Sequence, residues 1–148
     1  MKKILSIILI FAAFSSITFL ISRGIDSYQS TVNDAKYAKG ATLYEQKCAT
    51  CHQSSGEGIE GLYPPLQKSD FLHHDKNKII NVLLQGLSGH IEVNGKVFTG
   101  VMHPVTGTDD ELSDLLNYVY VRFGNQRYAF TPQEIGVLRE LHSSHSSN

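Results

Sequence analysis

The spacing of apolar residues predicts a mainly helical domain in the larger, C-terminal part of the chain. Between residues 108 and 123, apolar side chains recur at the three- and four-residue intervals of one helix face. They are Leu112, Leu115, Leu116, Val119 and Tyr120. The segment begins with Thr108-Asp109-Asp110-Glu111, which has the form of a capping box for the first backbone N–H groups of a helix. This is the clearest helix of the sequence, and its tyrosines are expected in the core.

A first helix is expected over residues 35–47, where alanines and tyrosines recur at helical spacing. Gly40 lies in its middle, although glycine inside a helix is less favourable than alanine by about 1 kcal/mol. A glycine at this position indicates close contact with another helix, and residues 108–123 are the expected partner.

Two shorter helices complete the helical prediction. Apolar residues over 77–85 predict one that ends at Gly86. A second capping signal, Thr131-Pro132-Gln133-Glu134, begins a last helix over residues 135–141. The serines and histidines beyond it are expected to form a disordered tail.

A β-hairpin is expected to interrupt these helices. Residues 91–98 alternate between apolar and polar side chains around Asn94-Gly95. This pair favours a type I′ turn, because both central residues of such a turn need a positive φ.

Gly56-Glu57-Gly58-Ile59-Glu60-Gly61 matches the GxGxxG pattern of dinucleotide-binding proteins. That pattern works only between a strand and the helix whose N-terminus receives the pyrophosphate, and neither is expected here. Nucleotide binding is therefore not predicted, and the glycines are interpreted as a loop.

The first residues carry a membrane-directed signal. An apolar run over residues 4–21 follows Lys2-Lys3 and ends at Ser22-Arg23. Its length lies between a signal-peptide core and a spanning helix, and its flank has no clean Ala-x-Ala cleavage site. We therefore expect a retained anchor, with a cleaved signal peptide as the alternative. The two lysines place the N-terminus in the cytoplasm and the rest of the chain in the periplasm or its equivalent.

Composition narrows the possible functions. A chain of 148 residues holds one domain and accessory segments, with no room for a separate catalytic domain. The formal net charge is −1, and all 14 acidic residues lie beyond the apolar run. Since no basic stripe is present, nucleic acid is not an expected partner.

The most informative chemistry lies in Cys48-Ala49-Thr50-Cys51-His52, directly after the first expected helix. Two thiols and an imidazole at this spacing are typical of c-type haem attachment. The cysteines would form thioethers with the porphyrin vinyl groups, and the histidine would ligate the iron. Three alternatives are weaker. A redox-active CxxC of thioredoxin type would follow a strand, whereas a helix is expected here. A zinc site would need a second ligand pair at finger spacing, which the sequence lacks. A disulfide across so tight a loop is not expected.

Met102 is the only methionine beyond Met1 and the candidate for the second iron ligand. It lies in the loop Thr99-Gly100-Val101-Met102-His103-Pro104, and a thioether ligand there would raise the haem potential. The rival ligands are histidines that are each expected at the surface, namely His103, His73-His74 and His90. An open iron site would instead suit gas sensing or peroxidase chemistry.

Three segments together resemble the class I cytochrome c family. They are Cys48-x-x-Cys51-His52, Gly61-x-Tyr63-Pro64-Pro65-Leu66, and Gly100-x-Met102 before a tyrosine-bearing helix. The resemblance covers about residues 35–130. It implies an all-α class I cytochrome c fold with a small β-hairpin before the methionine loop, preceded by the membrane segment.

The resemblance also implies particular contacts. In this family a proline carbonyl accepts a hydrogen bond from the second nitrogen of the ligand histidine, a role that would fall on Pro64. The contact between the N- and C-terminal family helices would fall on Gly40 and Tyr44 against residues 115–120.

The function implied by the resemblance is that of a single-electron carrier and not an enzyme. One covalent haem c, with its iron held by His52 and Met102, would pass electrons between a redox donor and acceptor such as an oxidase, dehydrogenase or reductase. A haem-based gas sensor or peroxidase-like protein with an exchangeable sixth ligand is the alternative.

The expected organisation is an anchor or uncleaved signal at 1–23, a linker at 24–34, the cytochrome c domain at 35–142 and a disordered tail at 143–148. The domain would be held at the inner membrane and face the periplasm, or be soluble in the periplasm after cleavage.

Overall fold

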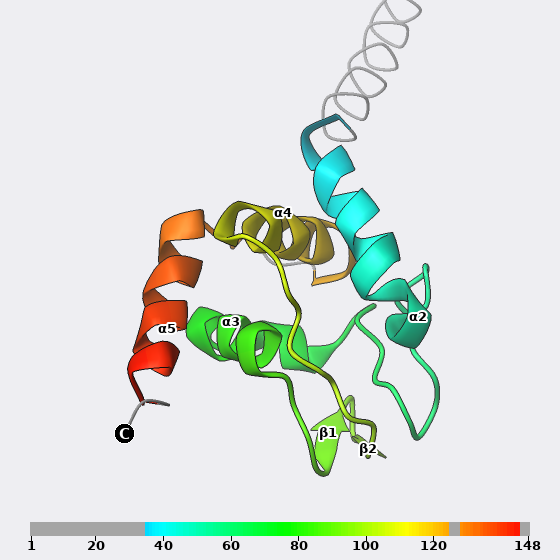
Figure 1. Ribbon diagram of the computed structural model, residues 1–148. Coiled ribbons are helices and arrows are strands. Elements are labelled where there is room, and N and C mark those ends of the chain that lie inside the picture. The colour runs from blue at the N-terminus through cyan, green and yellow to red at the C-terminus, as the bar shows by residue number, and fades with distance from the viewer. Residues whose placement is uncertain (1–34, 125–127, 146–148) are drawn as a thin grey trace, which may run out of the picture. The chain divides into compact units, whose positions relative to one another are not determined.

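The structure is a computed structural model that describes residues 35–124 and 128–145 (Figure 1). The predicted membrane segment at 1–23, the linker at 24–34 and residues 146–148 of the predicted tail lie outside the described residues. Within the described ranges, none of the helices combines the length and the apolar character needed to span a membrane.

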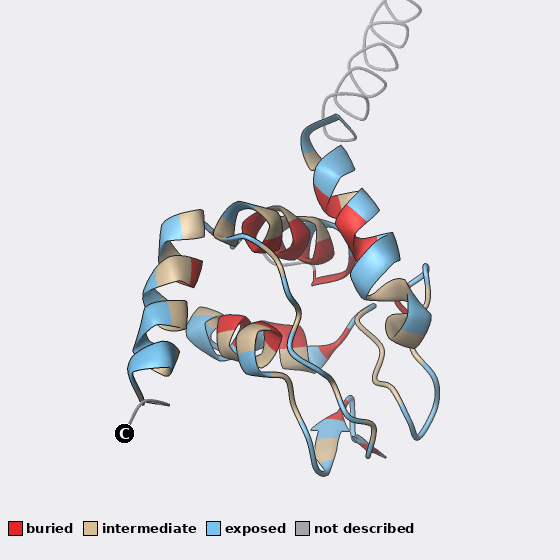
Figure 2. Ribbon diagram, viewed as in Figure 1, coloured by how far each residue is buried: buried red, intermediate tan, exposed pale blue. Residues whose placement is uncertain are grey.

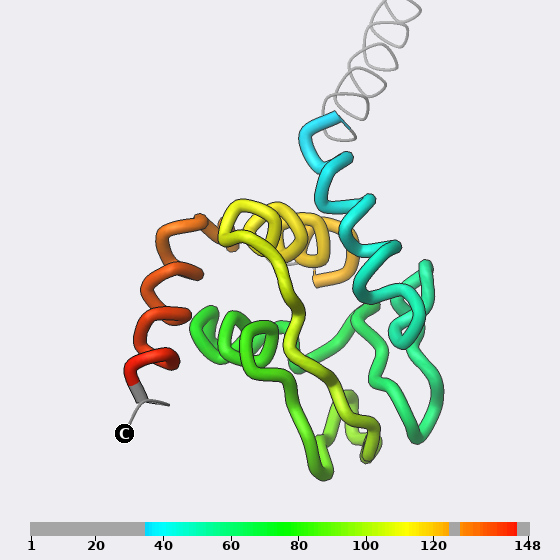
Figure 3. The backbone as a smooth tube through the Cα atoms, viewed as in Figure 1, coloured from blue at the N-terminus to red at the C-terminus, as the bar shows by residue number. Residues whose placement is uncertain are grey.

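The described chain is mainly helical with one small sheet, as the apolar spacing predicts. The elements are a helix over residues 35–47, α2 (Ala49–His52), the 3₁₀ helix η1 (Asp70–His73), α3 (Lys76–Gln85), β1 (Ile91–Val93), β2 (Lys96–Phe98), α4 (Asp109–Val119), the π-helical turn η2 (Tyr120–Gly124) and α5 (Pro132–His145). The chain path in Figure 3 shows α5 alongside the ends of α3 and α4, and it contacts both.

The helix over residues 35–47 crosses α4 at Gly40, as predicted. A Cβ atom at Gly40 would lie 2.2 Å from the backbone oxygen of Asp114 and 2.6 Å from Cβ of Tyr118. One turn later, the ring centroids of Tyr44 and Tyr118 are 5.7 Å apart. The glycine therefore lets the two helices approach until one backbone touches the other.

Helix α4 begins at the predicted capping box. Thr108 Oγ1 accepts a hydrogen bond from the Glu111 N–H at 3.2 Å, and Glu111 Oε2 accepts one from the Thr108 N–H at 2.9 Å. The regular helix ends at Val119, and η2 carries the chain on to Gly124. The helix predicted to reach residue 123 therefore continues there as a π turn.

The apolar core gathers between the helix over 35–47, α3, α4 and η2 (Figure 2). Its buried residues are Leu43, Tyr44, Leu72, Ile79, Ile80, Leu83, Leu112, Leu115, Leu116, Val119, Tyr120, Phe123, Phe130 and Ile135. Tyr120 is fully buried and its hydroxyl donates to the Leu72 carbonyl oxygen at 2.8 Å. The predicted apolar stripe and the core position of Tyr120, the first residue of η2, are thus confirmed, whereas Tyr118 is only partly buried and packs against the core.

Helix α3 forms close to its predicted position. The side chain of Asp75 caps its first turn by accepting hydrogen bonds from backbone N–H groups, and the helix ends at Gly86, whose φ is 78°. Glycine adopts this left-handed conformation without a steric penalty, which is why the helix stops there.

The hairpin pairs β1 and β2 in antiparallel register, with Ile91 opposite Phe98. Asn94 and Gly95 have φ values of 53° and 73°, as the predicted type I′ turn requires. Reciprocal hydrogen bonds of 3.0 and 2.9 Å join the backbone and side chain of Asn94 to those of Asp70 in η1. These bonds hold the hairpin against the preceding part of the chain.

Helix α5 is longer than predicted. The capping signal at Thr131 and Glu134 is present, but the helix runs over Pro132–His145 and includes residues 143–145, which the sequence predicts to be part of a disordered tail. The reason lies in contacts with α3, because His142 Nε2 is 2.8 Å from Asn81 Oδ1 and Nδ1 contacts Gln85. Apolar spacing carries no signal for such polar contacts, so the expected boundary at residue 142 is corrected.

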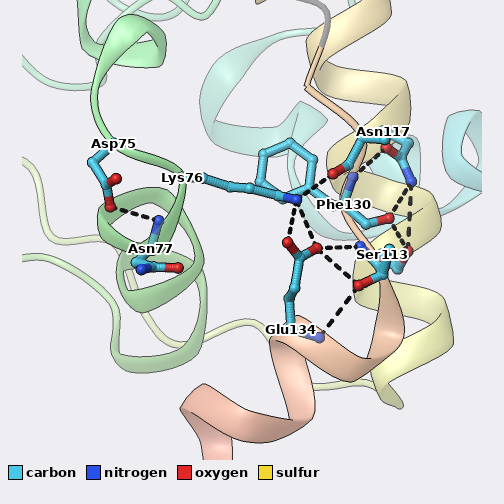
Figure 4. A network of polar contacts seen from close by, with 9 residues as sticks. Asp75, Lys76, Asn77, Ser113, Asn117, Phe130 and Glu134 are labelled. Carbon is cyan, nitrogen blue, oxygen red and sulfur yellow. Dashed lines mark hydrogen bonds and ion pairs between the residues drawn. The ribbon is translucent and has the colours of Figure 1, made fainter.

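A polar network joins α5 and the segment before it to α3 and α4 (Figure 4). Lys76 Nζ lies 2.6 Å from both carboxylate oxygens of Glu134 and also donates to the Ala129 carbonyl oxygen. The Phe130 carbonyl oxygen accepts from Ser113 Oγ at 2.8 Å and from Asn117 Nδ2 at 2.9 Å. The network fixes where the chain enters α5.

Replacing Glu134 with glutamine is expected to lower stability near neutral pH and to make little difference in acid. The hydrogen bond from Lys76 lowers the pKa of Glu134 from its ordinary value of 4.5. A carboxyl group with a lower pKa in the folded state stabilises that state above the unfolded pKa and loses this contribution as the pH falls through the folded pKa. Because the Glu134 side chain is 42% exposed, the expected loss is at most about 1 kcal/mol. Thermal unfolding of both proteins at about pH 7 and about pH 3 checks this, and an equal difference at both values would contradict it.

Candidate functional site

The one-turn helix α2 carries the cysteine pair and the histidine. The preceding helix ends at residue 47, and the Cys48 N–H still donates to the Tyr44 carbonyl oxygen at 2.8 Å. The N–H groups of Cys51 and His52 then both donate to the Cys48 carbonyl oxygen, at 3.1 and 2.9 Å. This turn places two free thiols and an imidazole on the wall of one cavity.

The cavity has a volume of about 400 Å³. Cofactor and small-molecule sites span about 300–1,000 Å³, so the space is of a suitable order. Apolar side chains make up much of its wall, among them Leu66, Leu72, Ile79, Leu83, Val93, Leu115, Leu116 and Val119. The predicted site residues Cys48, Cys51, His52, Pro64 and Met102 all line it. The fold therefore brings together residues that lie far apart in the sequence.

The imidazole of His52 is oriented by a backbone oxygen. His52 Nδ1 lies 2.9 Å from the Pro64 carbonyl oxygen, which can only accept, so Nδ1 carries the proton and donates. Nε2 is then the nitrogen with a free lone pair, the form in which histidine ligates a metal. Burial lowers the pKa of His52, and the Pro64 hydrogen bond opposes this effect only in part. Both observations favour a neutral imidazole.

The thiol of Cys48 does not have the character of a redox-active thiol. Burial raises the pKa of Cys48 to about 11, whereas the nucleophilic cysteine of a CxxC oxidoreductase has a lowered pKa. The motif also follows a helix and not a strand. Both features argue against the thioredoxin-type alternative.

Met102 reaches the cavity from a loop, and two backbone hydrogen bonds to Leu87 hold it in place. Its N–H donates to the Leu87 carbonyl oxygen and its carbonyl oxygen accepts from the Leu87 N–H, each at 2.8 Å. Gly86 makes this approach possible, since a Cβ atom there would lie 2.2 Å from the Met102 backbone oxygen. The half-buried methionine is therefore presented to the cavity by a fixed backbone.

The family model that describes cytochrome c matches residues 37–120, the span that contains α2, the hairpin, Met102 and α4. The chain belongs to the cytochrome c family. Members of this family carry covalently attached haem c with iron, which is therefore the cofactor of this cytochrome. The helical fold with one small hairpin agrees with the family.

Named relatives point the same way. Cytochrome c-552 of Thermus thermophilus is 38% identical, over 69% of this chain and 85% of that protein. The fructose dehydrogenase cytochrome subunit of Gluconobacter japonicus is 29% identical, over 77% of this chain but 24% of that protein. The cytochrome c subunit of the quinone alcohol dehydrogenase of Gluconobacter oxydans is 28% identical, over 58% of this chain and 18% of that protein. These names support an electron-carrier role with redox-protein partners.

The residues around the cavity of this cytochrome fit haem c. Two free thiols separated by two residues lie in one helical turn, an imidazole with an available Nε2 follows, and a thioether lies on the same wall. Much of the remaining wall is apolar, as a porphyrin requires. Among the described residues, no group of three or more histidine, cysteine, aspartate or glutamate side chains could hold a metal ion without such a cofactor.

The rival histidines are distributed as the sequence suggests. His73, His74 and His90 are exposed and lie outside the cavity wall, which leaves them far less suited to ligation than Met102. His103 is also exposed but does line the cavity, so it is the one histidine to test against its neighbour Met102.

The glycine-rich stretch serves close packing in the described structure. It follows α2 and not a strand, in agreement with the rejection of nucleotide binding. A Cβ atom at Gly58 would lie 2.4 Å from the Tyr63 carbonyl oxygen, and one at Gly56 would lie 2.7 Å from the Phe123 ring. These glycines let the chain fold back from α2 toward Pro64.

Sequence reasoning missed several residues of the cavity wall, among them Lys47 and Ser69. Lys47 Nζ donates to the Thr106 carbonyl oxygen at 2.8 Å, which ties the end of the first helix to the segment before α4. Ser69 is a buried polar residue on the same wall. The position of Lys47 beside Cys48 was a signal for the first, whereas nothing in the sequence marks Ser69.

Proposed function

We propose that this cytochrome is a single-electron carrier in which Cys48 and Cys51 hold haem c by thioethers and His52 and Met102 ligate the iron. The observation that carries the proposal is that His52 and Met102 line one and the same apolar cavity, although they come from different segments. The Met102 backbone is held by two hydrogen bonds to Leu87, which supports a permanent ligand in preference to an exchangeable one. A permanent ligand suits electron transfer better than gas binding.

The side chains of the cavity have distinct tasks in this mechanism. Bound haem c supplies an iron that alternates between the ferrous and ferric states, which is the one-electron chemistry. The Pro64 carbonyl oxygen fixes the proton on His52 Nδ1 and thereby orients the ring. Leucine, isoleucine and valine side chains keep water from the site, while Leu87 fixes the Met102 backbone.

The setting we propose follows from the sequence. The apolar run at 4–21 behind Lys2-Lys3 supports a domain tethered to the inner membrane on the periplasmic side. Donor and acceptor would be periplasmic or membrane redox enzymes, and the dehydrogenase subunits among the relatives support this class of partner.

Absorption spectra of the purified full-length protein test the proposal. The ferric form is expected to show the weak red charge-transfer band of methionine ligation, and the ferrous form is expected to bind carbon monoxide poorly. A ferric spectrum without this band, together with tight carbon monoxide binding, would overturn the His52/Met102 assignment in favour of a haem-based sensor or peroxidase-like protein.

A further inference from the structure

Gln53, the residue that follows His52, has a backbone conformation that residues other than glycine rarely adopt. Its φ and ψ are 64° and 155°, and it closes the C-terminal end of α2. This region is populated almost only by glycine, since a Cβ atom crowds the neighbouring backbone. Such a conformation persists only where the surroundings hold it, and it tends to mark a functional site.

Three hydrogen bonds hold the Gln53 backbone. Its N–H donates to the Ala49 carbonyl oxygen at 2.8 Å, and its carbonyl oxygen accepts from the Gly56 N–H at 3.0 Å. Both partners are local. The third bond comes from the preceding helix, where the Tyr44 hydroxyl donates to the same Gln53 carbonyl oxygen at 2.6 Å.

Tyr44 is itself immobilised by the core. The side chain is fully buried, and its ring centroid lies 5.7 Å from that of Tyr118 and 5.1 Å from that of Phe123. A phenylalanine would fill the same space, so the hydroxyl is needed for the hydrogen bond and not for packing. A buried hydroxyl without a partner would be unfavourable, and Gln53 supplies that partner.

The direction in which the chain leaves Gln53 decides which later backbone groups can form hydrogen bonds with His52. The Gly58 N–H donates to the His52 carbonyl oxygen at 2.9 Å, and six residues further on the Pro64 carbonyl oxygen reaches His52 Nδ1. Both bonds lie beyond the sharp turn at Gln53, which sets the direction in which the loop begins. A relaxed Gln53 would turn the loop elsewhere and draw the Pro64 oxygen away from the imidazole.

We propose that Tyr44 is a positioning residue for the axial histidine. Its hydroxyl holds the Gln53 peptide in the left-handed conformation, so that the loop over residues 54–64 presents the Pro64 oxygen to His52 Nδ1. This inference rests on the proposed function, because it treats His52 as the iron ligand. The hydrogen bond at Nδ1 makes the imidazole more basic and favours ferric iron, so weakening it raises the midpoint potential.

The test is a Tyr44→Phe substitution in the haem-loaded, full-length protein, with Tyr120→Phe as the matched control. Tyr120 is also fully buried and also donates its hydroxyl to a backbone oxygen, but that oxygen belongs to Leu72. Both variants lose one buried hydrogen bond and are expected to melt at lower temperature. Only Tyr44→Phe is expected to raise the midpoint potential and to shift the NMR resonance of the His52 Nδ1 proton.

A second substitution tests the role of strain. In the Tyr44→Phe background, Gln53→Gly is expected to restore both the potential and the resonance, because glycine adopts this conformation without help. Gln53→Gly alone is expected to raise the melting temperature, and it can be measured whether or not Tyr44→Phe folds. A lower or unchanged melting temperature for Gln53→Gly would overturn the proposal.

Other results would also overturn it. An unchanged potential and Nδ1 resonance in Tyr44→Phe, equal shifts in both tyrosine variants, or no rescue by glycine would each show that Tyr44 has only a structural role. Failure of the proposed function is a separate result, visible as a wild-type spectrum that lacks the features of histidine and methionine ligation.

Discussion

Replacing Met102 with alanine is expected to lower the midpoint potential of the haem by about 0.1 V or more, within the range of about 0.8 V that axial ligands set. The thioether is a soft ligand that stabilises ferrous iron, so its removal favours the ferric state. The weak red charge-transfer band of the ferric protein should disappear, and the ferrous form should now bind carbon monoxide. Potentiometry followed by absorption, together with a carbon monoxide titration, measures all three effects.

His103→Ala is the matched control for this prediction. His103 is adjacent to Met102, lines the same cavity and is the rival ligand, but its side chain is exposed. The His103→Ala substitution is therefore expected to leave the charge-transfer band and the midpoint potential unchanged. The reverse pattern, in which the band survives Met102→Ala and the spectrum changes in His103→Ala, would assign the second axial position to the histidine.

The helices that depend on local signals could be predicted from the sequence. The capping box at Thr108 and Glu111 lies within four consecutive residues, and the apolar stripe of α4 needs only the helical period. The turn at Asn94-Gly95 is equally local, because the backbone preference of those two residues selects it. Even the crossing at Gly40 was foreseeable, since a glycine within a helix needs a reason in packing.

Long-range polar contacts could not be predicted in this way. The extension of α5 to His145 depends in part on the contact of His142 with Asn81, and serine and histidine carry little helix preference of their own. The bond from Tyr44 to Gln53 joins a side chain to a backbone oxygen nine residues on, and a positive φ at glutamine has no sequence signature. Such contacts appear only once the chain is folded.

The candidate site lies between these cases. Cys48, Cys51 and His52 are contiguous, so their placement on one turn follows from the motif alone. Met102 could be nominated by elimination, but its presence on the same cavity wall depends on the bridge to Leu87 and on the space left by Gly86. The sequence thus identifies the chemical groups, whereas tertiary packing brings them together.

Replacing Gly40 with alanine is expected to destabilise the folded protein by about 2–3 kcal/mol, at the upper end of the usual cost of overpacking. Alanine is the better helix former by about 1 kcal/mol, so propensity alone predicts the opposite sign. The added Cβ would lie 2.2 Å from the Asp114 backbone oxygen, and a backbone atom in the middle of α4 cannot move aside as a flexible side chain can. The helix over 35–47 must therefore shift away from α4, and it carries Cys48 and the packing of Tyr44 with it.

Gly136→Ala in α5 is the matched control, because the same atom is added to another helix interior. Its Cβ would meet only the side chain of Asp109, with Oδ2 at 2.9 Å, and moving that carboxylate would weaken its half-exposed ion pair with Arg139. Because such a pair contributes little, the better helix propensity is expected to offset the loss and leave stability within about 1 kcal/mol of the original. Denaturant unfolding of the haem-loaded variants measures both values. Equal stability changes in the two variants would show that the backbone of α4 moves aside as easily as a side chain does. Close backbone packing would then not hold the helix over 35–47 against α4.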